Sequence, residues 1–201
     1  MIQRQRDRRG EVEMHSYDIQ IKTQRIFRTL LQAMSRPGRV YVMDAPGEEV
    51  LLPVLQTLID NEVTFAVVGD NHESLKNEIV NATGSRAVAI EDADYVVVPS
   101  GDSEGAILRA KRGSLDYPHA GATIVYLVDN LNDGKSGKPA CLLKGPGIEH
   151  EISPCINGLN KNDLIHLREI NSEYPLGVDA LFLDKTGLIL CIPRSISMEV
   201  I

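Results

Sequence analysis

The chain contains no tryptophan, and aromatic residues make up only 4% of its 201 residues. A surface that stacks nucleic-acid bases or cages a quaternary ammonium group needs several aromatic rings, so neither kind of site is expected. The formal net charge of -7 also argues against binding to nucleic acid or to an anionic membrane, since both require a basic face. Small molecules or other proteins are the expected partners.

Cysteine is scarce as well, and long apolar runs are absent. Cys141, Cys155 and Cys191 do not have the spacing of metal ligands or of a redox motif, which indicates a reducing compartment. No stretch of about 18 apolar residues could span a bilayer, and the first fifteen residues lack the apolar core of a signal peptide. We therefore expect a cytoplasmic protein with no metal and no cofactor.

The clearest structural pattern lies between residues 173 and 195. Residues 178–183 and 188–192 are almost wholly apolar, and the segment Asp184-Lys185-Thr186-Gly187 between them has the composition of a turn. This pattern predicts a β-hairpin. Because both strands are apolar on both faces, the hairpin should lie inside a covered sheet.

One charged residue inside this hairpin, Asp179, suggests an ion pair. If the four-residue turn places Leu183 opposite Leu188, Asp179 lies diagonal to Arg194 on the same face, within reach of a guanidinium group. We expect a partly buried Asp179/Arg194 pair that fixes the exit of the hairpin at Pro193. On this register, a one-residue bulge at Gly187 would send Arg194 to the opposite face and prevent the pair.

The rest of the chain alternates helical and strand patterns. A first helix is expected to end at Ser35-Arg36-Pro37-Gly38, because proline forbids continuation and glycine accepts a positive φ. Its apolar stripe comprises Ile26, Phe27, Leu30, Leu31 and Met34. Further helices are predicted at residues 50–60, 72–81 and 104–112 and after Asn160 or Asn162; further strands are predicted at 40–43, 63–68, 88–90, 95–98, 122–128 and 141–144.

This alternation predicts an α/β fold with three layers, α/β/α, around a mixed sheet. The strand at 141–144 should return beside the one at 122–128 as a hairpin. The domain is expected to span residues 16–201, and residues 1–15 are expected to form a disordered tail because they are polar.

Several polar clusters could bind a ligand, and each has a structural alternative. Arg36 and Arg39 flank the end of the first helix, where cations satisfy carbonyl groups at the negative end of the dipole more readily than they bind phosphate. The segment Glu149-His150-Glu151 contains groups that exchange protons near neutral pH. Neighbours in an extended segment point to opposite sides, so a solvated loop is the alternative there.

Two segments resemble phosphate sites only in part. The turn at 99–103 leads into a predicted helix, but Asp102 and Glu104 supply the negative charge that a helix N-terminus attracts. Gly134-Lys135-Ser136 resembles the end of a Walker A loop, yet Asp129 stands where the first glycine should be. Three residues remain as candidates for ligand binding: Arg194, Asp179 and Arg36. A structural role is the alternative for each of them. No catalytic residue and no metal ligand is predicted.

Six short strings, in order from about Tyr17 to Val200, resemble the PhnH family, a subunit of the bacterial carbon-phosphorus lyase system. The first string is the segment from Arg25 to Gly38, similar to the family's FRxLLxAMxxPG opening. The others are Asp60-Asn61-Glu62, Pro118 with Gly121-Ala122-Thr123, Lys144-Gly145-Pro146-Gly147-Ile148, Tyr174-Pro175-Leu176-Gly177-Val178-Asp179 and Ile192-Pro193-Arg194-Ser195.

The resemblance implies a fold similar to pyridoxal-phosphate-dependent transferases but without the cofactor. It further implies a homodimer in isolation and an assembly with the PhnG, PhnI and PhnJ subunits. Together with PhnL, the subunits PhnG to PhnI resemble machinery that displaces adenine from ATP with an alkylphosphonate, so the resemblance implies a role in forming ribose 1-methylphosphonate 5-triphosphate. The family pattern establishes no catalytic residue of this subunit, so an accessory role is expected.

Two alternatives remain open from the sequence. The protein could be a stand-alone enzyme that binds a phosphonate or a nucleotide, using His150 with a carboxylate or a free Arg194. It could also be a remnant of a pyridoxal-phosphate enzyme that still binds the cofactor, although no lysine lies in a recognisable cofactor-binding context.

Overall fold

The computed structural model describes residues 20–43, 50–69, 72–132 and 138–201. The expected tail at residues 1–15 and the Gly134-Lys135-Ser136 segment lie outside these ranges.

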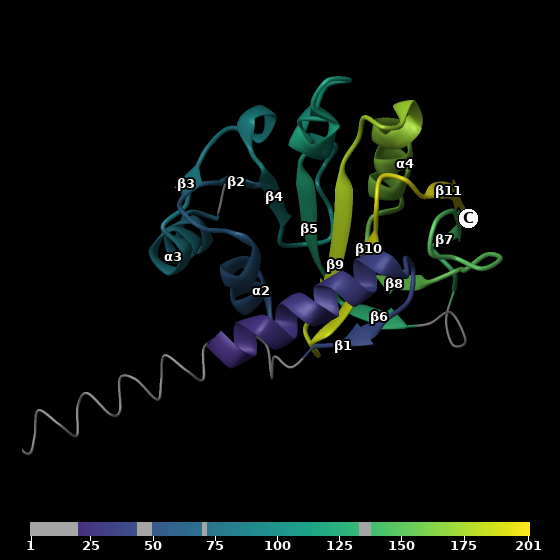
Figure 1. Cartoon of the computed structure of the whole chain (residues 1–201), viewed down its shortest axis with the longest axis horizontal. Coiled ribbons are helices and arrows are strands. Elements are labelled where there is room, and N and C mark those ends of the chain that lie inside the picture. Colours follow the sequence, from purple (N-terminus) through teal and green to yellow (C-terminus); the bar gives the residue numbers. More distant parts are fainter. Residues whose placement is uncertain (1–19, 44–49, 70–71, 133–137) are drawn as a thin grey trace, which may run out of the picture.

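A seven-stranded mixed sheet runs through the middle of the fold (Figure 1), with the strand order β1-β10-β9-β5-β4-β2-β3. The strands from β3 to β9 in this order are parallel, whereas β10 and β1 each run antiparallel to their neighbour. The strands are β1 (Tyr41–Val42), β2 (Thr64–Val67), β3 (Arg86–Ala87), β4 (Tyr95–Val98), β5 (Thr123–Val128), β9 (Asp179–Asp184) and β10 (Leu188–Ile192). The predicted mixed α/β architecture is confirmed.

The parallel strands are doubly wound. From β2 the chain moves outward to β3, and it then returns past β2 to β4, from which it continues in the other direction to β5 and β9. The strand order therefore reverses between β2 and β4. In open α/β sheets of this kind, a reversal leaves a crevice outside the carboxyl ends of the two strands.

Buried side chains form one cluster on each face of the sheet, which explains why the central strands are apolar throughout. Alternate residues point to opposite faces, so Phe182 joins one cluster while its neighbours Leu181 and Leu183 join the other. The same alternation places Val96 and Val97 in different clusters. The predicted covered hairpin is confirmed, and the sheet is the middle layer of three.

Helices cover both faces of the sheet. One face is covered by the first helix (residues 20–35), α2 (Leu51–Leu58) and α3 (Glu73–Thr83), and the other face is covered by α4 (Lys161–Ile170). In Figure 1, the first helix crosses the sheet, while α3 lies beside β2 and β3. Asn160 is the N-cap of α4, because its side chain accepts a hydrogen bond from the backbone N–H of Asn162.

The apolar stripe of the first helix is narrower than predicted. Ile26 and Leu30 are buried, but Phe27 and Leu31 are 46% and 54% exposed. The alanine at position 33 is fully buried instead. A helix that packs on one sheet buries only the residues nearest to it, so Phe27 and Leu31, at i and i+4, remain as an exposed apolar pair.

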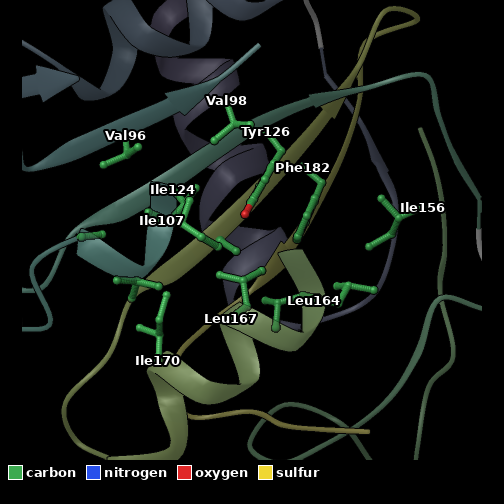
Figure 2. Close-up of a cluster of buried hydrophobic side chains, with 14 of the residues drawn as sticks. Val96, Val98, Ile107, Ile124, Tyr126, Ile156, Leu164, Leu167, Ile170 and Phe182 are labelled. Carbon is green, nitrogen blue, oxygen red and sulfur yellow. The ribbon is translucent and has the colours of Figure 1, made fainter. Parts of the chain in front are cut away.

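Tyr126 and Phe182 lie at the centre of the cluster under α4 (Figure 2), where their rings stack with centroids 5.1 Å apart. The Tyr126 hydroxyl donates a 2.9 Å hydrogen bond to Asp163 on α4. Burial raises the pKa of Tyr126 well above its ordinary value, and the adjacent Asp163 carboxylate raises it further. The other oxygen of Asp163 accepts from the backbone N–H of Ser103, so this buried carboxylate ties α4 to the loop after β4.

Three predicted elements are wrong. Residues 104–112 form only a four-residue 3-10 turn, η2 (Ala106–Arg109), because Glu104 and Gly105 adopt positive φ angles that interrupt an α-helix. The predicted strand at 88–90 is replaced by β3 at 86–87 and a 3-10 turn, η1 (Ile90–Asp92).

The third error concerns the partner of β7 (Cys141–Lys144). It was expected beside residues 122–128, but it pairs with β11 (Ser197–Val200) in a separate two-stranded sheet. The strand β6 (Asn130–Asn132) leaves the end of β5 and pairs with β8 (Cys155–Asn157). Since β4 and β9 already occupy both sides of β5, no edge is available for β7.

The turn between β9 and β10 is organised by Asp184, which is fully buried. One of its carboxylate oxygens accepts from the Thr186 hydroxyl and from the backbone N–H groups of Thr186 and Leu188 at 2.7–3.0 Å. The other accepts from the backbone N–H of Leu131 at 3.1 Å. Asp184 therefore joins the hairpin turn to β6.

The three cysteines are free and fully buried. Burial raises the pKa of the Cys141 thiol to about 12 and raises that of Cys191 as well. These thiols pack as small apolar side chains.

Candidate functional site

Arg194 and Asp179 form the ion pair that the hairpin pattern predicted. The Arg194 guanidinium donates to Asp179 through Nη2 at 2.6 Å and through Nε at 3.2 and 3.3 Å. The backbone N–H of Arg194 also donates to the same carboxylate at 2.9 Å. The side chains are 14% and 20% exposed, so the pair is partly buried, as expected.

The register behind this prediction is wrong by one residue. Ile189, not Leu188, lies opposite Leu183, because β9 continues through Asp184 and only residues 185–187 connect the two strands, with Gly187 at a φ of 88°. The pair forms nevertheless because β10 ends at Ile192, and the chain then turns, with the Ile196 N–H bonded to the Pro193 carbonyl. Strand alternation therefore no longer decides where the Arg194 side chain points.

Arg194 also binds a third segment of the chain. Its Nη1 donates to the Pro118 carbonyl at 2.7 Å, and Nη2 lies 3.5 Å from the Gly121 carbonyl. A Cβ on Gly121 would collide with the Gly177 carbonyl and the Arg194 guanidinium, so glycine is required where these segments meet. The guanidinium thus holds together the starts of β5 and β9 and the end of β10.

Other strings that resemble the family pattern also contact one another. The backbone N–H of Gly38 bonds to the Cys191 carbonyl at 3.0 Å. A Cβ on Gly147 would collide with the Ser35 carbonyl, and one on Gly145 would lie against Ser195 and Ile196. Strings far apart in the sequence therefore pack on one another, which explains why several of them contain glycine.

The remaining candidate residues do not join this cluster as a ligand site. The Arg36 side chain is exposed at the end of the first helix, and no partner for its guanidinium is found within the described ranges. Glu149, His150 and Glu151 are all exposed, and Glu151 pairs with Lys144 at 3.2 Å. These positions agree with the structural alternatives for both segments.

An exposed patch beside Arg194 was missed by the sequence analysis. Leu115, Tyr117 and Tyr174 are 76%, 63% and 67% exposed, and the Tyr117 ring meets the His119 ring edge-on at 6.0 Å. His119 and Tyr174 line the same hollow of about 490 Å³, and a second hollow of about 400 Å³ shares Tyr174 and Arg194 with it. We call Leu115, Tyr117 and Tyr174 the tyrosine patch. Its residues lie in loops without periodicity, so no sequence pattern distinguished them.

The cluster around Arg194 contains little that could act chemically. The Arg194 donors are already bonded to Asp179 and to two carbonyl groups, which leaves the guanidinium poorly suited to an incoming anion. Among residues 20–43, 50–69, 72–132 and 138–201, no group of three His, Cys, Asp or Glu side chains could hold a metal ion. Within the same ranges, no helix is long and apolar enough to cross a membrane.

These features define a doubly wound α/β protein. Its loops are held together by contacts among the six short strings described in the sequence. Residues 16–199 match the family model described as "Bacterial phosphonate metabolism protein (PhnH)". A protein of Stutzerimonas stutzeri named "Putative C-P lyase subunit protein HtxG" is 33% identical over 174 residues, covering 87% of this chain and 84% of that protein. The chain belongs to the PhnH family, which confirms the resemblance found in the sequence.

Proposed function

We propose that this protein is an accessory, non-catalytic subunit of a carbon-phosphorus lyase assembly that degrades phosphonates. Membership of the PhnH family supports this role, and so does the similarity to a protein named as a C-P lyase subunit. The structural observation that carries the accessory role is the Arg194 cluster, whose charged groups are used to join segments of the chain. Within the assembly, the subunit would assist the formation of ribose 1-methylphosphonate 5-triphosphate from ATP and an alkylphosphonate.

The expected partners are the PhnG, PhnI and PhnJ subunits in the cytoplasm. We propose residues 16–201 as the single domain that docks on them, with an architecture like that of pyridoxal-phosphate-dependent transferases but no cofactor. Arg194 and Asp179 have a structural role in this proposal, and Arg36 is left as a surface residue. The stand-alone enzyme requires a free Arg194 or a His150 paired with a carboxylate, and the described contacts favour neither.

Deletion of the gene is expected to abolish growth on methylphosphonate as the phosphorus source, while growth on phosphate stays normal. Tagged protein should co-purify with co-expressed PhnG, PhnI and PhnJ. Normal growth of the deletion strain on methylphosphonate would contradict the proposal. Tight binding of ATP or methylphosphonate to the isolated protein, measured by calorimetry, would favour the stand-alone enzyme instead.

We assign the tyrosine patch as the surface that docks on another subunit. Tyrosines are frequent hot spots of protein interfaces, because the ring buries a large apolar area while the hydroxyl can still form a hydrogen bond. Replacing Tyr117 and Tyr174 with serine should weaken the assembly roughly 30-fold or more, which corresponds to a hot-spot loss of about 2 kcal/mol. The measurement is affinity for the co-purified partner subunits by surface plasmon resonance.

A matched control is Val80→Ser, which changes a 38% exposed apolar residue on α3 and should leave the affinity unchanged. If the double tyrosine variant binds with unchanged affinity, the tyrosine patch is not part of the interface. That result would not contradict the accessory role itself.

In isolation we propose a homodimer, in which Phe27 and Leu31 supply apolar contact area on the first helix. The double variant Phe27→Ser, Leu31→Ser should sediment as a monomer with an unchanged circular dichroism spectrum, because both side chains are about half exposed. Val80→Ser again serves as the control and should remain dimeric. If the double variant is still a dimer, the dimer interface does not depend on Phe27 and Leu31.

A further inference from the structure

A groove lies between α4 and β11, next to the Arg194 cluster. It is the hollow of about 400 Å³ that meets the hollow beside the tyrosine patch at Tyr174. One wall consists of residues 167, 168, 171 and 172, and the other consists of residues 194–198. Ser197 and Met198 are neighbours in β11, and successive side chains of a strand point to opposite faces, so the groove reaches the edge of this strand. We call it the helix-strand groove.

The edge of β11 that faces away from β7 has no partner strand. Among the strands that the structure describes, β11 pairs only with β7. Met198 lies opposite Leu143, but the backbone N–H and C=O groups of Leu143 are both bonded to Ile152, on the other side of β7. The N–H and C=O groups of Met198 therefore point away from β7, as do those of Val200 two residues further on. Such an edge is a template for pairing with another chain.

The charge of the groove favours an acidic occupant. Arg168 lines the groove from the last turn of α4 and has no ion pair within the ranges that the structure describes. Arg194 is already neutralised by Asp179. No described aspartate or glutamate lines the groove, and Glu199 of β11 lies outside the lining. An incoming carboxylate would meet the unpaired guanidinium of Arg168, which can bind it through two parallel hydrogen bonds.

We propose that the helix-strand groove binds an extended acidic segment of a partner subunit, which adds to the free edge of β11 as a further strand. The main chain of this segment bonds to the N–H and C=O groups of Met198, and one of its carboxylates pairs with Arg168. Strand addition takes its affinity from main-chain hydrogen bonds and its specificity from side-chain contacts. The inference rests on the accessory role proposed above, and it extends the docking surface from the tyrosine patch across Tyr174.

The test compares amide hydrogen exchange in the isolated full chain and in its assembly with co-expressed PhnG, PhnI and PhnJ. The amides of Met198 and Val200 should slow at least about tenfold in the assembly, because their N–H groups gain acceptors. The amide of Glu199 should change less, since its N–H already faces β7. If exchange at Met198 and Val200 is the same in both states, strand addition is wrong while the accessory role stands.

Val200→Pro tests the main-chain contact. It removes an N–H that points away from β7, and proline is tolerated at such positions of edge strands. Affinity for the partner subunits, measured by surface plasmon resonance, should fall at least about tenfold, because proline cannot donate to an added strand. The matched control Val200→Thr keeps the N–H and should bind like the parent protein. Circular dichroism spectra of both variants should match that of the parent protein.

Arg168→Glu tests the charge independently of the strand. It changes an exposed residue, so the fold should be retained, and affinity should fall about tenfold or more while Arg168→Lys keeps most of it. A loss in Arg168→Glu without a loss in Val200→Pro would mean that only side chains meet there, and strand addition would be wrong. Parent-like binding by both variants would also contradict the inference. Failure of the parent protein to co-purify with any of these subunits would contradict the proposed function and this inference together.

Discussion

Replacing Arg194 with alanine is expected to lower the free energy of unfolding by about 3 kcal/mol, because the partly buried Asp179 side chain would lose its hydrogen-bonded partner. The substitution also removes one donor each from the Pro118 carbonyl, which still accepts from the backbone N–H of Gly121, and from the Gly121 carbonyl. Arg194→Lys should recover part of this loss, since an ammonium keeps the charge but cannot reach all of these acceptors at once. Urea denaturation followed by circular dichroism measures the difference.

Arg168→Ala is a suitable control for this experiment. Arg168 is an exposed arginine of α4 that lines one of the hollows beside Arg194, so its removal should change stability by less than about 0.5 kcal/mol. If Arg194→Ala were as stable as Arg168→Ala, the guanidinium would not be holding the three segments together. It would then be a candidate for anion binding.

The second large effect is expected at Asp184. Asp184→Ala should destabilise the protein by about 3 kcal/mol, because the buried N–H of Leu131 and the N–H groups of the hairpin turn lose their shared acceptor. Hydrogen exchange should accelerate in β6 as well as in the turn, since the carboxylate joins the two. Thermal unfolding together with residue-resolved exchange tests both statements.

Lys185→Ala changes the neighbouring residue of the same turn, which is exposed, and should have almost no effect on stability. A loss below about 1 kcal/mol for Asp184→Ala would show that water replaces the carboxylate at little cost. Faster exchange in the turn but not at Leu131 would limit the role of Asp184 to the hairpin.

The layers of the fold could be predicted because they follow from local patterns. Apolar strands such as 178–183 specify burial on both faces, and Asn160 marked the start of a helix by its capping chemistry. The Asp179/Arg194 pair was also predictable, since it joins residues of one hairpin. Its register was not, because Asp184 can belong to a four-residue turn or, as observed, to the end of β9.

Pairing between distant segments could not be predicted from local patterns. Nothing within residues 141–144 indicates that they pair with 197–200, because the choice depends on β4 and β9 having occupied both sides of β5. The prediction of a helix at 104–112 was wrong for a similar reason, because it too considered only local spacing. The apolar spacing around Ile107 fits a helix, but tertiary contacts between this segment and α4 hold it in a tighter turn.

The candidate site was predicted in part. Arg194 and Asp179 were found as a pair, whereas the tyrosine patch depends on loops that converge only in the folded chain. An exposed tyrosine and a buried one look alike in the sequence, as Tyr117 and Tyr126 illustrate.

The complete burial of all three cysteines has a practical consequence for studying the assembly. Maleimide reagents modify accessible thiolates, so the native protein should react slowly at these positions. A cysteine introduced at an exposed position outside the tyrosine patch, such as Val80 on α3, would then be the preferred attachment point for a fluorophore or spin label, with the natural cysteines left in place. Distances to partner subunits could thus be measured from one chosen point on the protein surface.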